Sequence, residues 1–204
     1  MSRLITFGDS FTYGHHLVDN NTQAWPAVLG TIMNLPVVNV AQPGSSNVEI
    51  LAEILNFEFK DNDLVIIGWT FVERDIVFKK EFFRIGEGKP VYHGGNHRLQ
   101  AWNDDPMSKQ WLNIYTDYDM SIKSGLHIHH AELYLDSLAL KQYHFLSHMQ
   151  SCNPFENTPT WIKEPKSLIK HLMFDKIDLA TDNSHPGAKS HSLLAEKLHE
   201  HITK

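Results

Sequence analysis

Apolar and polar positions change their spacing several times along the first 70 residues, and each change marks a predicted element. The runs at residues 4–7, 37–41 and 64–69 are short and rich in Val, Ile, Leu and Phe, as in strands of a parallel sheet that is covered by helices on both faces. Residues 24–33 and 47–55 lie between these runs and carry apolar side chains at helical spacing. Because strands and helices alternate, the pattern predicts a parallel sheet with right-handed crossovers.

Two of the predicted helices have recognisable starts. Ser46 and Glu49 have the spacing of a capping box, in which each side chain accepts a hydrogen bond from the other residue's backbone N–H. Near the C-terminus, Pro186 marks the start of the last helix, since proline is favoured in the first turn. The apolar stripe of this last helix is formed by Leu194, Leu198 and Ile202.

The helical and strand periodicities are both lost between residues 71 and 130, where aromatic residues recur among Gly, Asn and Asp. We interpret this stretch as an insertion that overhangs the carboxyl ends of the strands, with a short helix near residues 72–83. Residues 131–150 read mainly as helix, and a fourth strand at 143–149 is the alternative. The 204 residues are therefore predicted to form a single domain of the α/β class, a three-layer α/β/α sandwich with a central parallel sheet of four or five strands.

Composition narrows the function classes. The formal net charge is −6 and there is no long basic run, which argues against a nucleic-acid partner. Cys152 is the only cysteine, so no internal disulfide can form. No apolar stretch has transmembrane length and the N-terminus lacks a signal-peptide pattern, so we expect a cytoplasmic protein or one carried out on a larger assembly.

Candidate chemistry lies near the two ends of the chain. Ser10 follows the first strand, at the edge where parallel sheets place their ligands. Asp182 precedes His185 by three residues, in a turn before the last helix. A serine hydroxyl becomes nucleophilic when an imidazole takes its proton and a carboxylate orients that imidazole. The pattern favours a catalytic triad. The alternative is that Asp182 or Ser184 caps the helix and His185 is a surface residue.

Gly8-Asp9-Ser10-Phe11 and Asp182-x-x-His185 resemble the first and last sequence blocks of the SGNH (GDSL-like) hydrolases, and the resemblance covers residues 3–70 and 180–204. It implies a flavodoxin-like SGNH fold and a serine esterase that needs no cofactor. Ser10 would be the nucleophile, His185 the general base and then the general acid, and Asp182 the group that orients His185.

The same resemblance assigns an oxyanion hole. Gly44 matches the glycine of the second block, so the backbone N–H groups of Ser10 and Gly44 are the expected donors. Gly68 matches the third block, Gly-x-Asn-Asp, but Thr70 stands where that block has its asparagine. We assign Thr70 as the third donor, although its hydroxyl is shorter than an amide and can rotate away.

The resemblance further suggests O-acetyl groups on carbohydrate, or short-chain lipid or thioester substrates. The aromatic insertion favours a carbohydrate ester, because aromatic rings can stack on sugars; the alternative is a satellite core beneath the insertion. The residues that we expect to contact the substrate are Asp9, Trp69, Trp102 and Trp111.

A binding or structural protein and a metal-dependent phosphoesterase are two alternative function classes. An SGNH-fold binding or structural protein with weak or no turnover is suggested by the departure at Thr70, whereas the retained triad residues argue against it. A metal-dependent phosphoesterase could use the histidines of residues 93–97 or 127–130. No carboxylate or cysteine spacing completes either cluster, so we predict no metal site.

Overall fold

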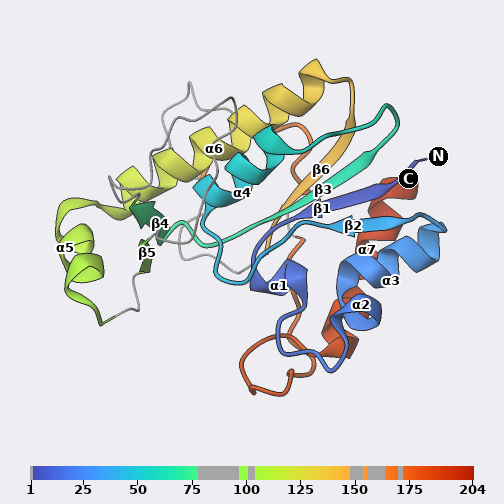
Figure 1. Cartoon of the computed structure of the whole chain (residues 1–204), viewed down its shortest axis with the longest axis horizontal. Coiled ribbons are helices and arrows are strands. Elements are labelled where there is room, and N and C mark those ends of the chain that lie inside the picture. The colour runs from blue at the N-terminus through green and yellow to red at the C-terminus, as the bar shows by residue number, and fades with distance from the viewer. Residues whose placement is uncertain (1, 78–96, 101–103, 148–153, 156–163, 170–171) are drawn as a thin grey trace, which may run out of the picture.

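Four parallel strands form the central sheet of the protein, in the order β2-β1-β3-β6 (Figure 1). The computed structural model describes residues 2–77, 97–100, 104–147, 154–155, 164–169 and 172–204. Within this part of the chain the sheet confirms the predicted α/β sandwich with four parallel strands. The strands are β1 (Leu4–Phe7), β2 (Val37–Asn39), β3 (Leu64–Trp69) and β6 (Lys141–Leu146).

Helices cover both faces of the sheet (Figure 1). On one face lie α3 (Trp25–Met33) and α7 (Ala188–Thr203), which pack against each other. On the other face lie α4 (Asn47–Asn56) and α6 (Asp117–Ser137), which also form a packed pair. The three layers predicted from the alternation of apolar runs are therefore present.

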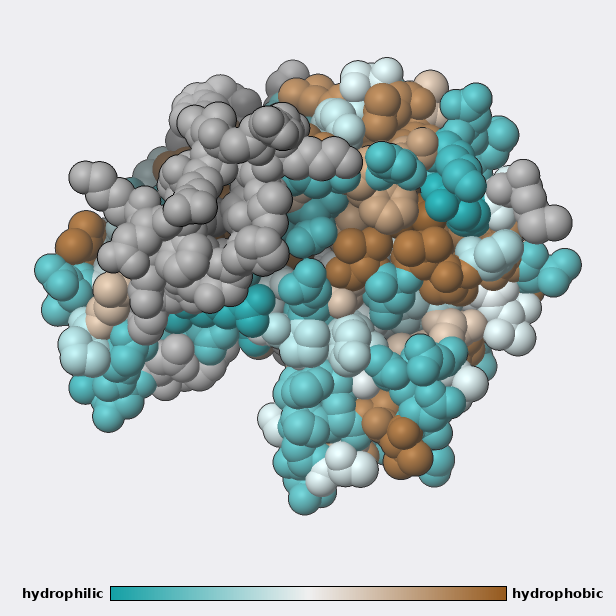
Figure 2. Space-filling view, viewed as in Figure 1, coloured by the Kyte–Doolittle hydropathy of each residue, from teal (hydrophilic) through white to brown (hydrophobic). Residues whose placement is uncertain are grey.

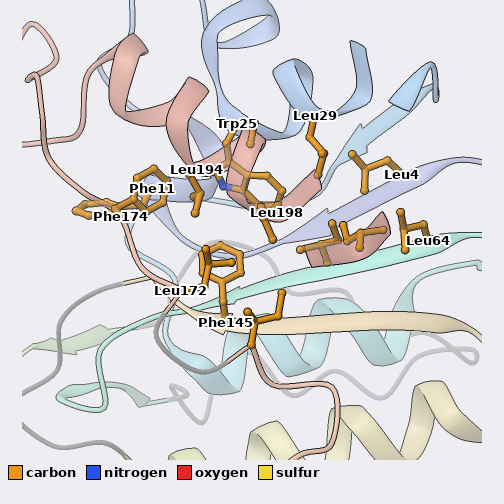
Figure 3. Packing of buried hydrophobic residues seen from close by; sticks show 14 residues of the cluster. Leu4, Phe11, Trp25, Leu29, Leu64, Phe145, Leu172, Phe174, Leu194 and Leu198 are labelled. Atoms are coloured by element: carbon orange, nitrogen blue, oxygen red, sulfur yellow. The ribbon is translucent and has the colours of Figure 1, made fainter. Parts of the chain in front are cut away.

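Each strand supplies both cores, because successive side chains of a strand point to opposite faces. Leu4 and Leu64 belong to the core beneath α3 and α7, together with Trp25 and Leu198 (Figure 3). Ile5, one residue after Leu4, belongs instead to the core beneath α4 and α6. All residues of β1 and β3 are buried, which fits sequences that are apolar except at Thr6, whose Oγ1 donates to Asn39 Oδ1 at 3.0 Å.

The capping box predicted at the start of α4 is confirmed. The Ser46 N–H donates to Glu49 Oε2 at 2.8 Å, and the Glu49 N–H donates to Ser46 Oγ at 3.4 Å. The last helix begins two residues after Pro186, with Gly187 as its N-cap, and Leu194, Leu198 and Ile202 are buried as expected. In the described part of the chain, no helix combines the length and apolar content that a bilayer crossing requires.

The segment after β3 differs from the prediction in its secondary structure. The short helix expected near residues 72–83 is wrong for the described residues, because β4 (Arg74–Val77) pairs in antiparallel fashion with β5 (His97–Gln100). Helix α5 (Pro106–Ile114) follows, and Val72, Leu99, Trp111 and Met120 form a satellite core. The residues between β4 and β5, 78–96, lie outside the described part of the chain.

The helix predicted over residues 131–150 instead begins at Asp117 and ends at Ser137. The fourth strand, which was the alternative prediction at 143–149, is present as β6. The polar residues of β6 made this strand difficult to predict from its sequence. His144 Nε2 donates to Gln142 Oε1 at 2.8 Å, and the Gln142 amide donates to the Glu132 carbonyl at 3.0 Å. Because these polar groups satisfy one another, a strand with little apolar character can occupy a buried edge position.

Candidate active site

Ser10 is the first residue of α1 (Ser10–Tyr13), at the carboxyl end of β1. The chain turns sharply at Gly8, where an added Cβ would lie 2.9 Å from the Gly68 carbonyl oxygen of the adjacent strand β3. Asp9 is the N-cap of α1, and its Oδ1 accepts a hydrogen bond from the Phe11 N–H at 3.0 Å. The absence of a side chain at residue 8 and the cap at residue 9 together position Ser10 at the sheet edge.

His185 and Asp182 reach Ser10 from the turn before α7. The distance from Ser10 Oγ to His185 Nε2 is 3.1 Å, and the distance from His185 Nδ1 to Asp182 Oδ2 is 2.6 Å. Both distances lie within hydrogen-bonding range. The three residues therefore form a continuous chain from a hydroxyl through an imidazole to a carboxylate, although 175 positions separate Ser10 from His185.

The turn that carries Asp182 is held by its own hydrogen bonds. Asp182 Oδ1 accepts from the N–H groups of Ser184 at 3.1 Å and His185 at 3.0 Å. Burial would raise the pKa of Asp182, but hydrogen bonds from the His185 side chain and from these backbone groups outweigh it and lower that pKa below its ordinary value. An ionised Asp182 keeps the proton of His185 on Nδ1, so Nε2 is free to accept the proton of Ser10.

Two backbone N–H groups are the oxyanion donors that the sequence predicts, and their positions as donors stay a prediction. One belongs to Ser10 itself, at the N-terminus of α1. The other belongs to Gly44, whose φ of +79° lies in the left-handed region that glycine adopts without strain. No described residue accepts a hydrogen bond from either group.

Thr70 lies at the end of β3 with its hydroxyl turned to Asp9. Its Oγ1 donates to Asp9 Oδ2 at 2.7 Å and accepts from Arg74 Nη1 at 2.8 Å. Its N–H donates to Asn47 Oδ1 at 2.9 Å. The side chain that we aligned with the third-block asparagine therefore joins a buried polar network, and its role as an oxyanion donor stays a prediction.

The structure does not bring all four predicted substrate-contacting residues to one surface. Trp69 is fully buried, and its Nε1 donates to His144 Nδ1 at 3.4 Å in the core. Trp111 is buried in the satellite core, which is the alternative considered for the insertion. Asp9 is fully buried beside Thr70 and Arg74, and Trp102 lies outside the described residues.

Several residues near the site were not identified in the sequence. His15 and His16 follow α1, and both of their rings lie close to the His185 ring, at centroid distances of 5.4 and 5.3 Å. Arg74 belongs to the segment whose elements the sequence did not resolve. The only available signal was the pair of adjacent histidines directly after the Gly14 that ends α1, in a chain that contains fourteen histidines.

Among the solved structures with a similar fold are G-D-S-L family proteins and esterases. A member of the lipolytic protein G-D-S-L family from Veillonella parvula aligns over 100% of both chains with a TM-score of 0.50 and 13% identity. The psychrotrophic esterase EstA from Pseudoalteromonas sp. aligns over 98% of this chain and 96% of its own, with a TM-score of 0.56 and 13% identity. The acetyl xylan esterase Est2A from Butyrivibrio proteoclasticus has a TM-score of 0.58 and 11% identity, over 98% of this chain and 63% of its own.

No family model and no curated protein sequence matches the chain. At identities of 11–13% these structural neighbours show the fold and not the reaction. The fold is that of the G-D-S-L, or SGNH, hydrolases, which confirms the resemblance first indicated by the short blocks around Ser10 and His185.

Proposed function

We propose that the protein is a serine esterase that hydrolyses a small acyl ester through Ser10, His185 and Asp182. The observation that carries this proposal is the pair of contacts on the His185 ring, 3.1 Å to Ser10 Oγ and 2.6 Å to Asp182 Oδ2. A surface histidine after a helix cap would have no reason to join these two groups.

The reaction follows from the geometry. Ser10 Oγ attacks the ester carbonyl carbon while its proton passes to His185 Nε2, and the carbonyl oxygen becomes an oxyanion that accepts from the N–H groups of Ser10 and Gly44. His185 then gives that proton to the departing alcohol, which leaves an acyl group on Ser10. Water gives a proton to His185 and attacks the acyl carbon, the bond from that carbon to Ser10 Oγ breaks, and His185 returns the proton to Ser10 Oγ as the acid leaves.

Acetyl groups on carbohydrate are the substrate class that we favour. The structural neighbours include an acetyl xylan esterase and a carbohydrate esterase, with TM-scores of 0.58 in both cases. These similarities support the choice only as analogy, since they concern fold. The small size of the acyl group is a prediction that a chain-length series of p-nitrophenyl esters, from acetate to decanoate, would test directly.

A second candidate is an SGNH-fold binding protein with weak or no turnover. One observation favours it: the Thr70 hydroxyl donates to Asp9 Oδ2 and so is directed to a buried carboxylate instead of a substrate. A site with two oxyanion donors in place of three would lose about 3–4 kcal/mol of transition-state stabilisation. The protein would then bind an ester or a carbohydrate and turn it over slowly.

Labelling with a fluorophosphonate probe separates the two candidates. An active triad is expected to give a covalent adduct at Ser10 that is absent in Ser10→Ala. Ser184→Ala is the matched control, because Ser184 is exposed and adjacent to His185, and this variant should label like the wild type. A wild-type protein that is folded but takes no label would contradict the esterase and leave the binding protein.

A further inference from the structure

The triad is adjacent to an additional imidazole that the proposed reaction does not use. Among the described residues, one group of three His, Cys, Asp or Glu side chains has the spacing of a metal site: His16, Asp182 and His185, with one ligand atom of each within 4.8 Å of the others. His16 Nε2 lies 3.8 Å from Asp182 Oδ2, the oxygen that also contacts His185 Nδ1.

The backbone fixes His16 in this place. His16 has a φ of +64°, a left-handed conformation that is uncommon for residues other than glycine, although Asn, Asp and His adopt it more often than most. Its carbonyl oxygen accepts two hydrogen bonds from Thr181, from the N–H at 3.2 Å and from Oγ1 at 2.9 Å. Because Thr181 precedes Asp182, this double contact joins the end of α1 to the triad turn and holds the His16 ring beside the carboxylate. Strained backbone that surrounding contacts maintain is frequent at functional sites.

We propose that His16, Asp182 and His185 bind a zinc ion, or a similar late divalent transition metal, and that the bound metal switches the esterase off. Two imidazoles and one carboxylate are donors that suit zinc, whereas magnesium and calcium prefer sites built of oxygen alone. Zinc at 2.0–2.1 Å from three tetrahedral ligands needs them about 3.4 Å apart. Side-chain rotation in this cluster can supply that spacing.

The site is open enough for an ion to enter. The His16 side chain is 40% exposed and those of Asp182 and His185 are each 21% exposed. The lobe that carries the connection after α1 and the segment before α7 is mainly hydrophilic on the face seen in Figure 2. A water molecule can complete the fourth position of the metal.

Inhibition follows from the tautomer of His185. A metal on Nδ1 takes the lone pair of that nitrogen, so the ring proton moves through solvent to Nε2. Nε2–H can then only donate to Ser10 Oγ and cannot accept its proton, which leaves the nucleophile inactive. The inhibition rests on the proposed function, whereas binding of the metal does not require the protein to be an esterase.

The first test measures protection of Ser10. Wild-type protein is labelled with the fluorophosphonate probe in a series of Zn²⁺ concentrations, with Mg²⁺ in parallel and with a chelator added at the end. We expect Zn²⁺ at micromolar concentration to suppress labelling reversibly, and Mg²⁺ to have no effect. In His16→Asn the concentration for half-protection should rise at least about tenfold, because one of three ligands is lost.

Asparagine is the informative substitution at this position. It adopts the left-handed conformation readily and leaves the carbonyl contact to Thr181 intact, whereas alanine would be strained. Labelling of His16→Asn without metal should stay within about twofold of the wild type. His130→Gln is the control, because His130 is exposed and belongs to the other histidine-rich segment; its zinc response should equal that of the wild type.

The second test does not depend on activity. Isothermal titration of Ser10→Ala with Zn²⁺ should show one strong site, and Ser10→Ala/His16→Asn should lack it. If the wild type takes no label, the proposed esterase fails while this titration still decides the metal site. Equal zinc protection and equal titration curves with and without His16, or a strong site removed by His130→Gln, would overturn the inference.

Discussion

Asp9 and Arg74 form a buried ion pair next to Ser10, with 2.8 Å between Asp9 Oδ2 and Arg74 Nη1. The Asp9 side chain is fully buried and that of Arg74 is 10% exposed. Burial lowers the pKa of Arg74 and the charge of Asp9 opposes this effect. Because Asp9 also caps α1 through the Phe11 N–H, the ion pair links strand β4 to the start of the helix that carries Ser10.

Removal of the Arg74 side chain should therefore destabilise the folded protein. Arg74→Met leaves the Asp9 carboxylate buried beside Thr70 without its cation, and we expect the free energy of unfolding to fall by about 3–5 kcal/mol. Urea unfolding followed by tryptophan fluorescence measures the change. The double variant Asp9→Asn/Arg74→Met removes both charges and should recover part of the loss. A double variant less stable than Arg74→Met would contradict this account of the pair.

Thr70 offers a test of what replaced the third-block asparagine. Its hydroxyl donates to Asp9 and accepts from Arg74, so Thr70→Val should destabilise the protein by about 1–3 kcal/mol and lower the labelling rate of Ser10 through a shifted α1. Thr70→Ser keeps the hydroxyl and should resemble the wild type in both measurements.

Thr70→Asn then addresses the oxyanion itself. If the third donor is simply missing, an amide at this position should raise turnover of p-nitrophenyl acetate by up to about 10²–10³ with little change in KM. If the Thr70 hydroxyl is the donor, Val should cost turnover beyond its effect on stability and Asn should gain nothing. Unchanged turnover in both variants would remove residue 70 from the oxyanion hole.

Two buried histidines should make stability depend on pH. Burial lowers the pKa of His144 to about 3, and burial also lowers that of His191 to about 4, against the opposing charge of Asp178. The unfolded chain binds these protons near pH 6.5, so the unfolded state holds more protons below that pH and stability falls on acidification. Between about pH 6.5 and 5 each histidine should contribute up to about 1.4 kcal/mol per pH unit.

The contribution of His191 can be isolated. Its Nδ1 accepts from the Trp25 N–H at 3.0 Å, and an asparagine side chain can present an oxygen at the same place without titrating. We expect His191→Asn to have a shallower slope of unfolding free energy against pH than the wild type, measured by urea unfolding at several pH values. The exposed His201→Asn is the control and should keep the full slope. Identical slopes in all three proteins would contradict the assignment of this pH dependence to His191.

The fold could be predicted from the sequence where the local pattern of apolar and polar residues indicates one type of element. Strands β1 and β3 bury apolar side chains on both faces. The short sequence blocks that contain Ser10 and Gly68 were recognisable. Strand β6 was ambiguous because its buried His144 and Gln142 have partners on other elements: Trp69 Nε1 donates to His144 Nδ1, and the Gln142 amide donates to the Glu132 carbonyl. A local pattern carries no information on such pairing.

The candidate site shows the same division. The spacing of Asp182 and His185 is local, and a turn of that length predicts that the two side chains meet. The positions of His16 beside Asp182 and of Arg74 beside Asp9 depend on contacts between segments that are far apart in sequence. Trp69 differs in another way, since we expected it to contact the substrate and its side chain is fully buried.

The last prediction concerns Asp182, which has two separable roles. Oδ1 holds the turn through the N–H groups of Ser184 and His185, and Oδ2 fixes the His185 tautomer. Asp182→Asn can keep the first role with its amide oxygen. Its NH₂ group would face His185 Nδ1, which must then accept, so the ring proton moves to Nε2 and Ser10 loses its base.

We therefore expect Asp182→Asn to reduce the fluorophosphonate labelling rate by about 10⁴-fold, the scale known for the same change in a serine protease triad, with a small change in melting temperature. Asp182→Ala should lose both roles, so it should be similarly inactive and also less stable. Asn183→Gly is the neighbouring control, because residue 183 has a φ of +56° that glycine accepts and its side chain has no part in the triad. An Asp182→Asn protein that labels within tenfold of the wild type would show that His185 does not need the carboxylate, and the triad would reduce to Ser10 and His185 alone.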